Sequence, residues 1–150
     1  MGSLMQEVDV IANVAHVIQL AVAPVFLLTG VGSLLSVLVN RLARVVDRFR
    51  VLDVQLPTAL ELATTFIHKE MSVLSQRARL IHWAIGLSTG CALLVCVVIG
   101  TLFLSAMIGV DLSNVISILF ILAMFALVSA LLCFLYEIQL ATSSIDVTPR

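Results

Sequence analysis

Three long stretches without a charged residue constrain this 150-residue chain more than any other feature. They run over residues 10–40, 80–110 and 112–136 and are 31, 31 and 25 residues long. A helix crosses the apolar core of a bilayer in about 20 residues. Charged residues make up only 11% of the sequence, against about 25% in soluble domains. The stretches therefore predict transmembrane helices at about residues 11–40, 80–108 and 113–137.

The charges are distributed unevenly between the two ends of these spans. Seven of the eight basic residues lie between residues 41 and 79, which connect the first two spans. The opposite side has Glu7, Asp9 and Asp111 and no basic residue. Because short loops rich in Lys and Arg stay in the cytoplasm, this asymmetry predicts that the N-terminus is outside and the C-terminus is cytoplasmic.

The connection over residues 41–79 is too long for a tight turn. Apolar residues recur at helical spacing on both sides of Pro57, which indicates two helical arms that turn near residues 53–57. The predicted fold class is an all-α membrane protein, with three transmembrane helices and a long cytoplasmic helical hairpin between the first and the second. One membrane domain over residues 1–150 accounts for the whole pattern.

The first span has a polar half. The small and polar residues that share this half of the helical wheel are Asn13, His16, Gln19, Gly30, Ser33 and Asn40. Lipid should contact the aliphatic half, so the polar half should face protein or water. One interpretation is a pore lined by this helix, in which His16 is either a pH-responsive gate or an interfacial residue. The other is a helix interface that uses small and polar residues for close approach.

Proline and glycine mark three further positions within the spans. Pro24 removes a backbone donor from the first helix, which is tolerated in lipid where neighbouring helices satisfy the freed carbonyl group. Gly86 and Gly90 form a GxxxG pattern, which lets another helix approach closely. We interpret all three as helix-packing residues.

A cluster of charges follows the first span and comprises Arg41, Arg44, Asp47, Arg48 and Arg50. Asp47 can pair with Arg44, with Arg50, or with an arginine of the second arm. Glu70 can pair with Arg77 or with the first arm. One interpretation is a topology signal with salt bridges across the hairpin. The other is a ring of arginines in an oligomer, which attracts anions or anionic lipid headgroups.

These residues also carry a resemblance to a known family. The segments that carry it are Ala23-Pro24-Val25-Phe26-Leu27, Asn40-Arg41 with Arg44, Asp47-Arg48 with Arg50 and Leu52, and Glu70 with Leu74, Arg77, Arg79, Leu80 and Ile81. Over roughly residues 8 to 140 the chain resembles a bacterial three-helix inner-membrane family catalogued as a domain of unknown function. The resemblance implies a multi-pass protein of the bacterial inner (plasma) membrane and supplies no activity.

Several classes of function are disfavoured by the sequence. It contains no nucleophile elbow, phosphate loop or metal-protease motif, so we do not expect an enzyme. The three cysteines lie in apolar runs without metal-ligand spacing, and we expect no metal and no cofactor. A net charge of -1 argues against a nucleic-acid partner.

Two functions remain as hypotheses for this bilayer protein. The first is a homo-oligomeric membrane channel, an ion-conducting pore lined by the first helix. The alternative is a non-conducting scaffold or regulatory subunit, which binds a partner protein or anionic lipid through the basic cytoplasmic hairpin.

Overall fold

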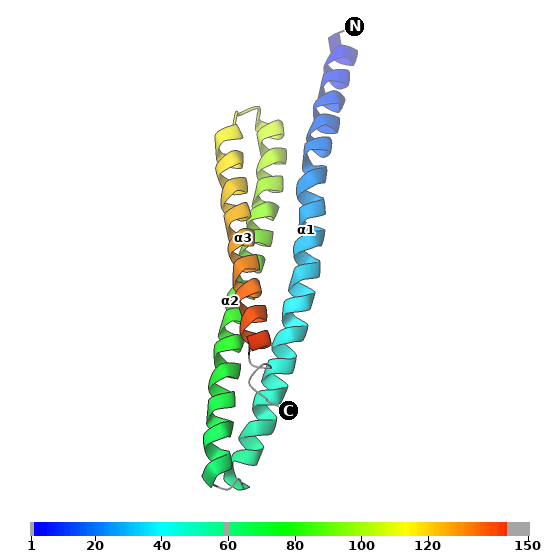
Figure 1. Cartoon of the computed structure of the whole chain (residues 1–150). Helices are drawn as coiled ribbons and strands as arrows, with labels where there is room; N and C mark the ends of the chain where they lie inside the picture. Colours follow the sequence, from blue (N-terminus) through cyan, green and yellow to red (C-terminus); the bar gives the residue numbers. More distant parts are fainter. Residues whose placement is uncertain (1, 59–60, 144–150) are drawn as a thin grey trace. The chain divides into compact units, whose positions relative to one another are not determined.

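Every described residue outside the turns belongs to a helix. The computed structural model describes the backbone of residues 2–58 and 61–143 and the side chains of residues 14–57 and 63–142. Helix α1 spans Gly2–Gln55, the short 3-10 helix η1 spans Leu56–Thr58, α2 spans Glu61–Ile108, and α3 spans Ser113–Ser143 (Figure 1). The prediction of an all-α protein is confirmed for these residues.

Three of these helices are long and apolar enough to cross a membrane. The qualifying segments within the described residues are Val14–Gln55, Ala63–Ile108 and Ser113–Thr142. Each contains or largely covers one of the predicted spans. The chain is therefore a membrane protein with transmembrane helices, as the uncharged stretches predicted.

The turn between α2 and α3 follows from local chemistry. Gly109 directly follows α2 with a φ of 72°, a left-handed conformation that glycine adopts without steric cost. Its N–H donates to the carbonyl oxygen of Ser105 at 2.9 Å, which completes the end of α2. Asp111 accepts hydrogen bonds from the hydroxyl and the backbone N–H of Ser113, where α3 begins. These hydrogen bonds lower the pKa of Asp111, because they favour the charged carboxylate. Asp111 therefore caps the start of α3.

The chain divides into two compact units. The first combines the described parts of Met1–Ser33 with Thr89–Leu127, and the second combines Leu34–Ser88 with the described part of Val128–Arg150. In the first unit, the buried residues come from all three long helices and include Val31, Cys91 and Ala123. Small side chains at such positions allow helices to approach closely.

The second unit buries residues at intervals of seven. In α1 these are Leu38, Val45 and Leu52, in α2 they are Leu74, Ile81 and Ser88, and in α3 they are Ala130 and Glu137. A seven-residue interval keeps one seam of a helix facing its neighbours, as in coiled-coil packing. Leu38, Val45, Leu52, Leu74, Ile81 and Ala84 form one hydrophobic core. The single charged member of the pattern, Glu137, lies at the end of the α3 seam.

Candidate functional site

Glu137 is a buried carboxylate near the end of α3, a helix with no other charged residue. Its exposed fraction is 0%. The seven-residue interval of α3 directs it into the second unit, one interval after the buried Ala130. Transfer of a carboxylate out of water costs several kcal/mol unless the charge is paired and hydrogen-bonded. The partners of Glu137 therefore decide whether α3 can pack here.

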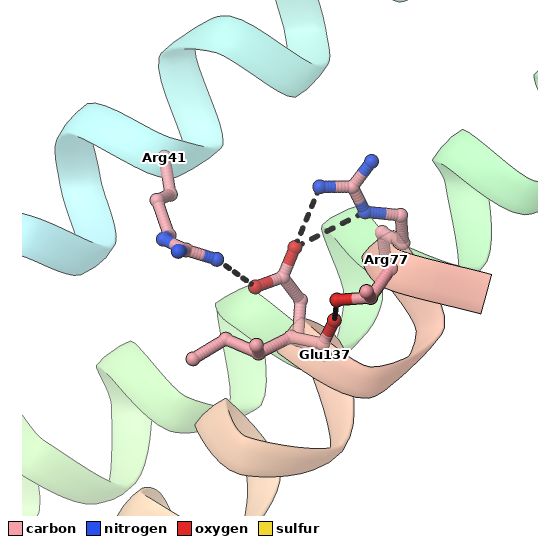
Figure 2. Close-up of polar contacts among 5 residues, drawn as sticks. Arg41, Arg77 and Glu137 are labelled. Atoms are coloured by element: carbon pink, nitrogen blue, oxygen red, sulfur yellow. Dashed lines mark hydrogen bonds and ion pairs between the residues drawn. The ribbon is translucent and has the colours of Figure 1, made fainter. Parts of the chain in front are cut away.

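Two arginines supply those partners from the other two long helices. Nη1 of Arg41, on α1, donates to Oε2 of Glu137 at 2.7 Å. Arg77, on α2, donates to Oε1 from Nη2 at 2.8 Å and from Nε at 3.1 Å. Figure 2 shows the two guanidinium groups approaching the carboxylate from different helices. Such charge-assisted hydrogen bonds are roughly twice as strong as neutral ones, so this cluster joins all three helices of the second unit.

Phe134 completes the environment of Arg41. It lies one helical turn before Glu137, and the guanidinium carbon of Arg41 is 5.1 Å from its ring centroid. An arginine over an aromatic face at this distance gains a cation–π interaction of about 0.5–1 kcal/mol or more. Phe134 and Glu137 therefore both contact the guanidinium group of Arg41.

A groove with four arginines lies beside Glu137 in the second unit. Its volume is about 340 Å³, and we call it the basic groove. Its lining residues are Arg41, Arg44, Val45, Arg48, Leu74, Arg77 and Ala141. The groove is therefore lined by arginines of α1 and α2 and by a few apolar side chains.

Arg48 forms a second ion pair at the rim of this groove. Its Nη2 lies 2.8 Å from Oε1 of Glu70, and the two side chains are 53% and 44% exposed. Exposed pairs of this kind contribute about 0.2–1 kcal/mol to stability. Breaking a buried pair costs more, about 3–5 kcal/mol. Of the two partners that the sequence suggests for Glu70, the one on the first arm is observed, while Arg77 binds Glu137 instead.

The predicted basic cluster is only partly brought together. Arg41, Arg44 and Arg48 line the basic groove. Asp47 and Arg50 are exposed and do not line it. Within residues 14–57 and 63–142, no ion pair of Asp47 with an arginine is formed. The interpretation of this cluster as a ring of arginines in an oligomer stays a prediction.

The predicted pore-lining residues lie on the surface of the single chain. His16, Gln19, Gly30, Ser33 and Asn40 are all exposed. The hydroxyl of Ser33 donates to the carbonyl oxygen of Thr29 at 3.1 Å, so α1 itself satisfies this polar group. The side chain of Asn13 lies outside the described residues. These five positions of α1 are therefore left uncovered by the rest of the described chain.

The predicted packing residues divide into two kinds. Pro24 is buried within α1, seven residues before the buried Val31. A Cβ atom built on Gly86 or Gly90 meets no atom within 4 Å in this chain. The close approach of another helix that the GxxxG pattern predicts is thus not made between described residues of this chain, and it stays a prediction.

Glu137 is the site residue that sequence reasoning missed. Along the sequence it is simply the charge that follows the third apolar stretch. One signal was available, since Ala123, Ala130 and Glu137 are seven residues apart. Glu137 is also an acidic residue on the side of the spans where the basic residues gather. Among the described residues, no group of three His, Cys, Asp or Glu side chains is placed to hold a metal ion.

Comparisons with known proteins give one match. A family model described as "Protein of unknown function (DUF2721)" matches residues 21–147, which include Arg41, Arg77 and Glu137. No curated protein and no solved structure matches the chain. The match covers most of the sequence and confirms the resemblance inferred from the arginine-containing segments. The chain belongs to this DUF2721 family of proteins of unknown function.

Proposed function

We propose that the protein is a homo-oligomeric membrane channel in which the polar half of α1 lines the ion pathway. One observation supports this most directly. Gln19, Ser33 and Asn40 are exposed on the chain, whereas the buried side of the same helix is apolar. Polar side chains within a membrane normally face protein or a water-filled cavity. A second copy, or water in a pore between copies, satisfies that requirement.

Several copies are needed for such a pathway. Three helices do not enclose a wide pore, so the channel requires a closed ring of chains, for which cyclic symmetry is the usual arrangement. The open space at Gly30, Gly86 and Gly90 supports close packing of neighbouring chains, because a missing side chain lets helices approach.

The proposed topology places residues 41–79 as a helical hairpin in the cytoplasm of a bacterium, with the N-terminus outside the inner membrane. Helices α1 and α2 have 54 and 48 residues, more than twice the roughly 20 that cross a bilayer core. Parts of both helices must therefore leave the bilayer. The ends that meet at η1 contain most of the basic residues, which supports placing them in the cytoplasm.

Single cysteines test this topology. In a chain whose three native cysteines are replaced, we expect Val110→Cys to react with a membrane-impermeant maleimide in intact cells. Val54→Cys should react only after the membrane is permeabilised. Both positions are exposed on the chain, so accessibility to the reagent depends on the side of the membrane. Labelling of Val54→Cys in intact cells would overturn the proposed orientation.

Ion flux tests the channel itself. For the purified chain in lipid vesicles, we expect K⁺ or Cl⁻ flux that falls to the level of protein-free vesicles in the double variant Gln19→Leu, Ser33→Ala. The reason is that an aliphatic lining favours loss of water from a narrow pore. The matched control is the double variant Val25→Ala, Val39→Ala on exposed aliphatic positions of α1, which should conduct like the wild type.

Two results would contradict the channel. One is a wild-type chain that carries neither ion, and the other is a monomer in mild detergent. Flux that is equal in the two double variants would exclude α1 as the pore lining.

A second candidate is a non-conducting scaffold or regulatory subunit that binds a partner protein or anionic lipid through the basic hairpin. The observation that favours it is the basic groove with its four arginines. An oligomer that carries no flux but retains lipid or partner binding would support this function over the channel.

A further inference from the structure

We propose that the basic groove binds a phosphate group, carried either by a lipid headgroup or by a free phosphate ion. This site deepens the second candidate function and rests on it for the position of the groove at the membrane surface. The cysteine experiment tests that position separately. A wrong topology and a wrong binding site therefore give different results.

The charges around the groove do not balance. Four guanidinium groups line it, from Arg41, Arg44, Arg48 and Arg77. The carboxylates that pair with them are Glu137 and Glu70. Four positive charges against two negative charges leave a net charge of +2. An anion bound in the groove offsets this excess positive charge. Phosphate diesters and monoesters are both negatively charged and can therefore do so.

Arg44 accounts for much of this excess. It lines the groove, it is exposed, and it takes part in no ion pair among residues 14–57 and 63–142. Arg41 lies one turn before it and Arg48 one turn after it on α1. Residues three or four apart on a helix share a face, so these three guanidinium groups form a row along one wall of the groove.

Glu137 acts as a positioning residue for two of the four arginines, Arg41 and Arg77. It accepts one hydrogen bond from Arg41 and two from Arg77, while each guanidinium group has five N–H donors. The carboxylate therefore holds both arginines in place without using all their donors. Planar guanidinium groups held in this way match the oxygen geometry of phosphate.

The size and walls of the groove suit a headgroup rather than a large ligand. Its volume of about 340 Å³ is near the lower end of the roughly 300–1,000 Å³ typical of ligand sites. Val45 and Leu74 contribute apolar surface beside the arginines. A phosphate with an attached glycerol group contacts both kinds of surface, whereas a free phosphate ion contacts only the arginines.

Binding can be measured on the full chain in a neutral detergent. Native mass spectrometry would count bound phosphatidylglycerol, with phosphatidylcholine as the neutral-headgroup comparison. Calorimetry in the same detergent would measure the binding of inorganic phosphate. The test variant is Arg44→Gln, and the matched control is Arg50→Gln, an exposed arginine of the same helix that does not line the groove.

We expect Arg44→Gln to weaken phosphatidylglycerol binding about fivefold or more, the effect of one basic residue at an anionic surface. Arg50→Gln should bind like the wild type. Preferential binding of phosphatidylglycerol would assign the groove to a lipid headgroup. Binding of inorganic phosphate without that preference would assign it to a free phosphate. Equal binding by the two variants, or no binding of either probe by the wild type, would overturn the proposal.

Discussion

Glu137→Gln is expected to lower the free energy of unfolding by about 2–3 kcal/mol. Glutamine keeps the shape of the side chain, so the substitution removes the charge without leaving a cavity. Arg41 and Arg77 then lose their shared counter-charge, although they are only 30% and 22% exposed. Breaking a buried ion pair costs about 3–5 kcal/mol. The partial exposure of both arginines places the expected loss at or below the lower end of that range.

The measurement is unfolding of the chain in mixed micelles by increasing amounts of a denaturing detergent. The single tryptophan, Trp83, provides a fluorescence signal from the second unit. Glu70→Gln is the matched control, because it makes the same chemical change in the exposed pair with Arg48. It should cost less than about 1 kcal/mol. If both variants unfold at the same detergent fraction, the buried cluster does not stabilise the helix packing.

A double-mutant cycle separates the pairwise interaction from the general loss of charge. Arg77→Gln alone leaves Glu137 buried with one arginine. The combined Arg77→Gln, Glu137→Gln variant should be more stable than the sum of the two single effects predicts, by about 0.5–3 kcal/mol. Arg50→Gln combined with Glu137→Gln should be additive, since Arg50 lies outside the cluster.

Leu38→Ala is the second substitution with a large expected effect, about 2–4 kcal/mol. Leu38 is fully buried in the core of the second unit, in the same cluster as Ile81 and Ala84. Replacing it with alanine leaves a cavity, and neither lipid nor water restores the van der Waals attraction that the larger side chain supplied there. Helices in a membrane associate largely through such packing, because the hydrophobic effect between them is weak. The cavity therefore lowers the free energy of unfolding inside a bilayer as well.

The adjacent residue provides the control for this prediction. Val39 is 53% exposed on the same helix. Val39→Ala should change the free energy of unfolding by no more than about 0.5 kcal/mol, the usual range for surface substitutions. Both variants can be followed by the same Trp83 signal. Equal effects at the two positions would show that the seven-residue seam does not form the core of this unit.

The helices could be predicted because their causes are local. Uncharged stretches longer than a bilayer core form helices whatever their neighbours are, since lipid offers the backbone no other hydrogen-bond partner. The end of α2 at Gly109 and the cap at Asp111 likewise depend on residues a few positions apart. The family resemblance rested on arginine positions along the sequence and required no knowledge of the tertiary structure.

The buried faces were harder to predict. The helical wheel of the first span separates a polar half from an aliphatic half, and lipid was expected on the aliphatic half. The buried residues of α1 include Ala21, Val31 and Leu38, all of them apolar. A helical wheel of one helix shows which side chains are polar and which are apolar. It does not show which of the apolar side chains contact neighbouring helices and which contact lipid.

The uncharged stretches and the positions of the arginines are enough to show a helical membrane protein whose positive charge gathers at one end of its spans. Which carboxylate pairs with these arginines depends on how the three helices pack. Glu137 is 96 residues from Arg41 and 60 from Arg77, and the nearer acidic residues Asp47 and Glu70 do not bind either of them. The physical reason is that α3 brings a buried carboxylate between two other helices, where each arginine gains more from pairing than it does at an exposed site.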